Sequence, residues 1–390
     1  MSAVAAPVRG FSRAVWILVA ARAINKIGAF TLPFLGVVLT VEFKASLSET
    51  GLILAVFGAA TIPSRLLGGL LADRLGRRRT IVLGLVGCAV AQLWIALSHA
   101  LWSAVLATVL LGLAFEIYEP PSQAMIADVT EPEDRPAAYG LYSAALAAAG
   151  VLAGLLAAAI SHWDLRWLFV ADAITCLSCA TLVAAALPSD VRRHAPTDVP
   201  RTAGASPWRD SRLLLLLASG TIFATIYMQF VIGLPLTLIE QGLPNSGAGI
   251  VLAVSAITLI AAQRLLRVQN LDDFRSIAIG YALLATGLVA SAFAHTLLVF
   301  LLAAVLWSLG DLFLLTRYLT QASGLAPAEA RGRYLAIFGL SWGIATTIAP
   351  LTVTQLLKTS GPTGLWLTSA AVAAALAVLQ PWFRKRLAPA

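Results

Sequence analysis

Charged side chains stand at helical spacing inside two apolar stretches of the chain. Arg22, Asn25 and Lys26 occupy positions i, i+3 and i+4 in the first stretch, and Glu116 and Glu119 occupy i and i+3 in another. Each set therefore shares one face of a helix. A charge near the centre of a bilayer costs about 2.5 to 3.5 kcal/mol, so these residues need a functional or structural reason. Carboxyl groups beside cations can bind and release protons, and we expect proton exchange here.

The two sets predict two ion pairs. If the two stretches form antiparallel helices, Lys26 and Glu116 lie near the middle, while Arg22 and Glu119 lie nearer one end. We expect each cation to pair with the carboxylate at its own depth. Glu116 or Glu119 would then exchange a proton, and the cations would reset its affinity for protons during a conformational change. The alternative is a permanent ion-pair network that joins two helices.

A third carboxyl, Asp311, stands in a later apolar stretch without an evident partner nearby in the sequence. It is either a proton site or a contact for a cationic substrate. With Glu116 and Glu119 it completes the set of proposed proton-coupling residues. The candidates for contact with a substrate are Arg22, Asn25, Lys26, Tyr227, Gln229, Trp307 and Trp342. For Tyr227 and Gln229 the alternative is packing between helices.

Asp172, in the outer half of another stretch, is expected to bind a neighbouring helix by hydrogen bonds instead. Arg65 is close enough to a predicted membrane boundary to extend its charge into water. It could also join the charges of the nearby polar turn.

The composition shows which elements must hold these groups. Of the 390 residues, 59% are hydrophobic and only 12% are charged, and the mean hydropathy is +0.86. A soluble domain carries about twice that charged fraction, so the apolar surplus must face lipid. Membrane lipids are therefore an expected partner. Secreted, nucleic-acid-binding and ordinary soluble-enzyme classes are excluded, and the net charge of +8 is a signal of topology.

The chain contains twelve apolar stretches long enough to cross a bilayer as helices, which needs about 20 residues. They lie near 14–41, 48–72, 80–99, 101–126, 137–160, 166–187, 211–239, 247–266, 275–294, 296–321, 333–357 and 362–383. Most lysines and arginines fall in the loops on the side of the N-terminus. Because basic loops stay in the cytoplasm, both termini are expected there.

A polar, proline-containing segment at 188–210 divides the spans into six before and six after. We expect two related six-helix bundles, at 1–187 and 211–390, with a cytoplasmic linker between them. The fold class is thus an all-α membrane protein with twelve transmembrane helices in two pseudo-symmetric halves, and a binding site is expected between the halves.

Landmarks recur between the two predicted halves at an offset of about 195 residues. Gly84 corresponds to Gly280, and Glu116 corresponds to Asp311. These pairs support an internal repeat.

The turn between the second and third spans carries the most specific motif, GLLADRLGRRR at residues 69–79. It resembles the signature GxLaDRxGRRxxL loop of the major facilitator superfamily, with Ile81 at the last apolar position. The residues of this predicted cytoplasmic gate motif are Gly69, Asp73, Arg74, Gly76, Arg77 and Arg78. Gly69 would permit close helix approach, Gly76 a tight turn, and Asp73 could cap the next helix and accept an arginine. The alternative is a basic signal that only fixes orientation.

The resemblance extends over the whole chain in topology. The segments at 121–128, 331–334 and 342–350 further resemble the drug/proton antiporter-like group of multidrug and metabolite exporters. The resemblance implies that the first, fourth, seventh and tenth spans surround a central cavity. It also implies a monomeric secondary transporter of the inner membrane that works by alternating access. The expected activity is proton-coupled efflux of a small drug-like or amphiphilic substrate, driven by the proton gradient without a cofactor or a metal.

Other functions remain open at this stage. A transporter of sugars, amino acids or other metabolites, acting as a uniporter or symporter, fits the same motif. A membrane-embedded enzyme would need a catalytic constellation, but the four histidines are scattered near loops without HExxH spacing, and no Walker sequence occurs. A channel or a receptor that has lost transport would not require carboxylates at mid-membrane depth.

Overall fold

The computed structural model describes residues 12–130, 135–187, 207–263, 272–325 and 331–387. Within these residues all regular structure is helical, which confirms the predicted all-α class. Most of the predicted linker, residues 188–206, lies outside the described residues, and so do both ends of the chain.

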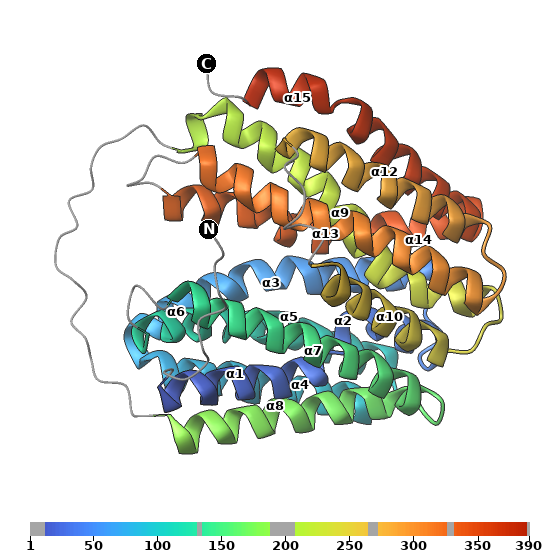
Figure 1. Cartoon of the computed structure of the whole chain (residues 1–390). Helices are drawn as coiled ribbons and strands as arrows, with labels where there is room; N and C mark the ends of the chain where they lie inside the picture. The colour runs from blue at the N-terminus through green and yellow to red at the C-terminus, as the bar shows by residue number, and fades with distance from the viewer. Residues whose placement is uncertain (1–11, 131–134, 188–206, 264–271, 326–330, 388–390) are drawn as a thin grey trace. The chain divides into compact units, whose positions relative to one another are not determined.

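The helices of the first half correspond to the first six predicted spans, two of which are interrupted (Figure 1). They are α1 (Arg13–Ile27), α2 (Thr31–Val41), α3 (Leu47–Leu75), α4 (Arg77–Leu97), α5 (Leu101–Phe115), α6 (Glu119–Asp128), α7 (Arg135–Ser161) and α8 (Arg166–Ala186). The first span is made of α1 and α2, and the fourth span is made of α5 and α6. Both interruptions were missed by the sequence analysis.

The second half contains α9 (Ser211–Glu240), α10 (Ser246–Ala262), α12 (Asp273–Ala292), α13 (Leu297–Leu325), α14 (Arg331–Val378) and α15 (Gln380–Leu387). α14 contains the last two predicted spans. They meet at Gly361, whose φ of 64° and ψ of −172° are not helical and suit glycine.

Ten segments of the described residues are long and apolar enough to cross a membrane. One of them is the double span of α14, and α10, with 17 residues, is a further apolar helix. The twelve predicted spans are all accounted for in this way. The predicted end of the eighth span, near residue 266, lies outside the described residues.

The helices form two compact units. One comprises the described residues of Met1–Thr31 and Ala59–Pro196, and the other comprises those of Leu32–Gly58 and Thr197–Ala390. The chain therefore passes between the units within each of its first two spans. The proposed division into bundles at 1–187 and 211–390 stays a prediction.

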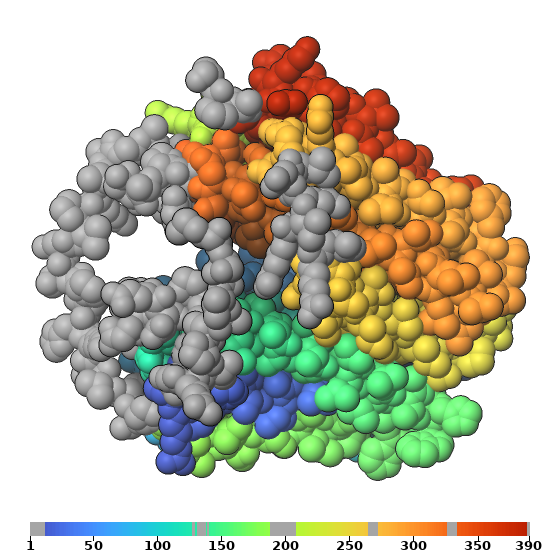
Figure 2. Space-filling view, viewed as in Figure 1, coloured from blue at the N-terminus to red at the C-terminus, as the bar shows by residue number. Residues whose placement is uncertain are grey.

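The same pattern of packing occurs in both units. In the first unit, α1 packs against α7 and α8, and α4 packs against α5, α6 and α8. In the second unit, α9 packs against α14, and α12 packs against α13 and α14. Figure 2 shows the surface of α1, in blue, directly beside that of α8, in yellow-green, although the two are far apart in the sequence.

The repeat-related glycines perform the same packing in each unit. A Cβ atom at Gly84 on α4 would lie 3.0 Å from the backbone nitrogen of Tyr118, and one at Gly280 on α12 would lie 3.1 Å from the carbonyl oxygen of Gly310. Each glycine thus brings its helix close to the backbone beside one of the two repeat-related carboxyls, Glu116 or Asp311. This shared packing supports the internal repeat.

Candidate functional site

The fourth span breaks between its two carboxylates. α5 ends at Phe115, α6 begins at Glu119, and Pro120 and Pro121 follow. Proline has no backbone N–H group, so these two residues cannot donate to the preceding turn. The N–H group of Glu116 donates to the hydroxyl of Ser64 on α3 at 3.0 Å. Broken spanning helices commonly line the binding sites of transporters.

Two glycines pack closely against this break. Gly68 on α3 lies so close to the carbonyl group of Ile117 that a Cβ atom would overlap it, and Gly84 lies against the same residue from α4. Gly69, by contrast, faces open space. The prediction that Gly69 permits close helix approach is therefore wrong. The preceding residue, Gly68, permits it instead. One residue along a helix turns a side chain by about 100°.

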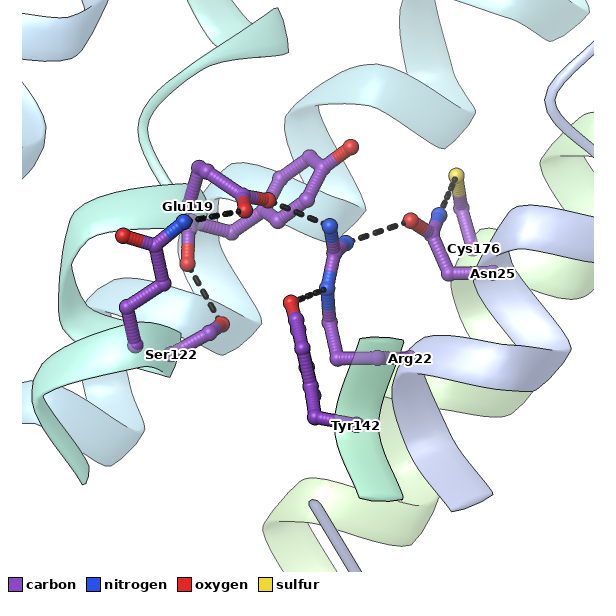
Figure 3. A network of polar contacts seen from close by, with 8 residues as sticks. Arg22, Asn25, Glu119, Ser122, Tyr142 and Cys176 are labelled. Atoms are coloured by element: carbon purple, nitrogen blue, oxygen red, sulfur yellow. Dashed lines mark hydrogen bonds and ion pairs between the residues drawn. The ribbon is translucent and has the colours of Figure 1, made fainter. Parts of the chain in front are cut away.

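Arg22 is the centre of the polar site in the first unit (Figure 3). It is 9% exposed, and its guanidinium forms an ion pair with Glu119. Nη1 donates to Oδ1 of Asn25 at 2.7 Å, and Nε donates to the hydroxyl of Tyr142 at 3.0 Å. The guanidinium carbon also lies 4.7 Å from the centre of the Tyr118 ring, which is a cation–π distance. The predicted pairing of Arg22 with Glu119 is confirmed.

Glu119 is itself held by two groups. Its Oε2 binds Arg22, and its Oε1 accepts a hydrogen bond of 2.9 Å from Nε2 of Gln123 on the next turn of α6. The side chains of Arg22 and Glu119 are 11% and 20% exposed. The pair is thus largely shielded from water.

The predicted pair of Lys26 and Glu116 does not form in the described part of the chain. Lys26 is exposed, Glu116 is half-buried, and neither side chain has a hydrogen bond or ion pair there. Glu116 and Glu119 were expected on one helix face because they are three residues apart. This expectation fails because the helix is interrupted at Glu116, where φ is −105° and ψ is −2°. The main cationic neighbour of Glu116 is Arg65 on α3.

In the second unit, Asp311 is buried on α13 and 2% exposed. Its Oδ1 has no hydrogen-bond partner, and no ion pair to it occurs among the described residues. Two aromatic contacts between α9 and α13 lie on either side of it. Phe230 contacts Trp307, one turn before Asp311, and Phe223 stacks on Tyr318, two turns after it, with ring centres 5.7 Å apart.

Tyr227 lies between these two contacts on α9 and therefore opposite Asp311. It is half-buried, and its ring meets that of Trp342 edge-on at 5.3 Å. Trp307 is only 2% exposed and packs inside the unit. Of the predicted substrate contacts, Tyr227 thus lies opposite the buried carboxyl, Trp307 lies one turn before it on α13, and Trp342 packs against Tyr227.

Gln229 points to a different part of the same unit. Its Nε2 donates to the hydroxyl of Thr352 at 2.9 Å, and its Oε1 accepts from the hydroxyl of Ser369 at 2.8 Å. It lines a cavity of about 300 Å³. The other lining residues are Thr221, Ile222, Thr225, Ile226, Ile348, Thr368, Ser369 and Val372. Gln229 therefore joins helices, which was the alternative expected for it, and also borders a cavity.

The polar turn at 69–79 is built differently from the prediction in one respect. Gly76 is the N-cap of α4 with a φ of 90°, which confirms the tight turn. Asp73 does not cap α4, because Gly76 occupies the N-cap position, no described side chain makes the cap hydrogen bond, and Asp73 belongs to the last turn of α3. It is exposed and has no ion pair in the part of the chain that the structure describes.

One arginine of this turn, Arg78, binds another helix of the first unit. Nη2 of Arg78 donates to the carbonyl oxygen of Ala184, near the C-terminus of α8, where a cation is favoured by the helix dipole. Arg77 lies on the first turn of α4, and Arg74 is exposed at the end of α3. The turn therefore links three helices of the unit.

Apolar spanning helices, a repeated packing pattern and charges held beside a broken span are the architecture of a secondary transporter. The family model of the Major Facilitator Superfamily matches residues 14–270, which is more than half of the chain. The chain belongs to this superfamily. It is therefore a multi-pass membrane protein of a transporter family, with a small molecule as its expected cargo, and this family is not a class of enzymes.

Individual relatives agree with this assignment. The chain is 28% identical over 345 residues to the uncharacterised MFS-type transporter YhjO of Bacillus subtilis, covering 86% of this chain and 84% of that protein. It is 25% identical to a Na(+), Li(+), K(+)/H(+) antiporter of Planococcus maritimus, with coverage of 82% and 84%. It is also 25% identical to the multidrug resistance protein MdtH of Cronobacter sakazakii, with coverage of 71% and 70%.

Solved structures share the fold at low sequence identity. A peptide transporter POT in complex with sulfate superimposes with a TM-score of 0.80 at 14% identity, covering 98% of this chain and 97% of that one. A bacterial homologue of the human lysosomal transporter Spinster, in an inward-facing and occupied conformation, gives a TM-score of 0.74 at 17% identity, with coverage of 96% and 98%. These similarities show the fold.

Proposed function

We propose that this protein exports drug-like or amphiphilic compounds across the cytoplasmic membrane by alternating access, driven by the proton gradient. Both termini would face the cytoplasm, and no cofactor would be needed. The observation that carries the proposal is the buried carboxyl of Asp311, which has no partner among the described residues. Binding of a proton is the simplest way to satisfy such a group.

The carboxyls of the two units have different surroundings. Glu119 is neutralised by the guanidinium of Arg22, whereas Asp311 is buried on α13 without a hydrogen bond or ion pair among the described residues. An ionised carboxylate in such surroundings costs several kcal/mol. The protonated acid avoids this cost, so proton release from Asp311 requires a rearrangement that admits water or a cation. Protonation would thereby be coupled to conformation.

Two observations support the proposed substrate class: the residues that line the cavity in the second unit, and the functions named for two relatives. The cavity beside Gln229 has isoleucine and valine side chains among its lining residues, which suits an apolar or amphiphilic molecule. A sugar would require many convergent hydrogen-bonding groups, but the hydroxyls of Thr221, Thr225 and Ser369 already donate to carbonyl oxygens of their own helices. MdtH is a multidrug resistance protein and the Planococcus relative is a cation/H(+) antiporter, which supports export in exchange for protons.

Transport into proteoliposomes under an imposed pH gradient tests this function. A panel of lipophilic cations, sugars and amino acids would be offered to the purified protein. We expect accumulation of lipophilic cations that disappears when the gradient is dissipated. Transport that is independent of the gradient would overturn proton coupling, and transport driven by a Na⁺ or K⁺ gradient would replace the proton by a metal cation. Selective transport of sugars or amino acids would overturn the substrate class.

A further inference from the structure

The hydrogen bonds of Arg22 continue away from Glu119 toward a second buried carboxyl. Asn25, which accepts from Arg22, donates its own Nδ2 to Sγ of Cys176 on α8 at 3.3 Å (Figure 3). The thiol of Cys176 in turn donates to Oδ1 of Asp172, one turn earlier on α8, at 3.7 Å. A continuous polar chain thus joins Asp172 to the Arg22–Glu119 pair inside the first unit.

Asp172 is firmly held at the end of this chain. It is 3% exposed, and its Oδ2 accepts a hydrogen bond of 2.8 Å from the hydroxyl of Thr31. Nε2 of Gln92 on α4 donates to the same hydroxyl at 3.3 Å, so the hydroxyl hydrogen of Thr31 must point to Asp172. The expected bond from Asp172 to a neighbouring helix is confirmed.

The acceptor groups determine the donor and the acceptor of every hydrogen bond in the series from Asp172 to Arg22. Both oxygens of Asp172 act as acceptors, so the thiol hydrogen of Cys176 points to Asp172 and its lone pairs point to Asn25. The amide nitrogen of Asn25 must then face the sulfur, which leaves its Oδ1 to face the guanidinium of Arg22. A flipped amide would instead direct N–H groups at a cation.

We propose that Asp172 is a positioning residue for the Arg22–Glu119 pair, acting through Cys176 and Asn25. It orients the amide of Asn25, which holds Nη1 of Arg22 and so aims Nη2 at Glu119. Its importance for transport rests on the proposed function, because it assumes that this pair takes part in coupling. The positioning itself can be measured without transport.

A double-mutant cycle on the purified protein in lipid nanodiscs tests this positioning, with the midpoint of thermal unfolding as the readout. Asp172→Asn and Glu119→Gln alter the two carboxyls at opposite ends of the hydrogen-bonded series. These two carboxyls have no hydrogen bond or ion pair to each other. If Asp172 holds Arg22 against Glu119, the shift of the double variant is smaller than the sum of the two single shifts. Additive shifts would overturn the proposal.

Cysteine variants provide a second cycle in case Asp172→Asn does not fold. Cys176→Ala removes the link, and we expect its shift to be non-additive with that of Glu119→Gln. Cys176→Ser keeps a donor and an acceptor and should restore most of the wild-type midpoint. Cys179 is also buried on α8 but has no hydrogen bond in the described part of the chain, so Cys179→Ala is the matched control and should be additive. Equal behaviour of Cys176→Ala and Cys179→Ala would overturn the proposal.

Transport by the same variants separates the two proposals. In proteoliposomes, Cys176→Ala should lower the gradient-driven rate several-fold, and Cys176→Ser should recover it. A wild-type protein without gradient-driven transport would refute the proposed function, while the unfolding cycle would still decide whether Asp172 positions Arg22.

Discussion

Replacing Glu119 by glutamine leaves the guanidinium of Arg22 buried without its counter-charge. The two side chains are only 11% and 20% exposed, so water screens the remaining charge poorly. Loss of one partner from a buried pair costs about 3 to 5 kcal/mol. Arg22 keeps Asn25, Tyr142 and the ring of Tyr118, which places the expected loss of stability for Glu119→Gln near the lower limit, about 3 kcal/mol.

Glu116→Gln is a matched control, because it makes the same chemical change three residues away. The side chain of Glu116 has no hydrogen bond or ion pair in the described residues, so the expected change is less than about 1 kcal/mol. The double variant Arg22→Met with Glu119→Gln removes both charges and should recover part of the stability lost in Glu119→Gln alone.

Equilibrium unfolding of the wild-type protein, of these three variants and of Arg22→Met, all in one membrane mimic, measures these differences. Equal destabilisation by Glu119→Gln and Glu116→Gln would refute the assignment of Arg22 to Glu119. A double variant that loses the full sum of both changes would also refute it, because it would show that the two charges do not stabilise each other.

Four further variants test the packing at three glycines and the role of Asp311. Gly68→Ala should destabilise the protein by about 1 to 3 kcal/mol through overlap with the Ile117 carbonyl, whereas Gly69→Ala, facing open space, should not lower the unfolding midpoint. Gly76→Ala should cost about 1 kcal/mol or more because φ is 90° there, and an unchanged midpoint would refute the turn geometry. Asp311→Asn should fold with at least wild-type stability, since no partner is lost, yet abolish gradient-driven transport; a large loss of stability would reveal a partner.

The spans and one ion pair could be predicted from the sequence because both depend on the order of residues within single helices. An apolar run of about 20 residues specifies a spanning helix whatever surrounds it. The pair of Arg22 and Glu119 followed from helical spacing and from relative depth along antiparallel spans. The contacts of Arg22 with Tyr142 and of Asn25 with Cys176 could not be predicted, because Tyr142 and Cys176 come from two other spans whose rotation about their axes is set by packing.

Two of the predictions failed for different reasons, one in the course of a helix and one in the packing between helices. Pro120 and Pro121 interrupt the fourth span, so the regular spacing that joined Glu116 to Glu119 does not hold there. These prolines were a visible signal for the break. The assignment of close packing to Gly69 was wrong by a single residue, and only the rotation of α3 against Ile117 distinguishes it from Gly68.

The surroundings of Asp311 could not be predicted from the spacing of residues along the sequence. The sequence shows that no charged residue lies near it on its own helix, but its isolation in space depends on the register of α9 against α13. That register follows from the contacts of Phe223 with Tyr318 and of Phe230 with Trp307. No spacing rule within one helix gives such a pairing.

Proton flux on addition of substrate tests the central claim most directly. Proteoliposomes loaded with a pH-sensitive dye would receive a transported lipophilic cation, with the wild-type protein and Asp311→Asn compared at equal reconstituted amounts. The coupling mechanism predicts a substrate-dependent pH change with the wild-type protein and none with Asp311→Asn. A proton flux through Asp311→Asn equal to that of the wild type would contradict it.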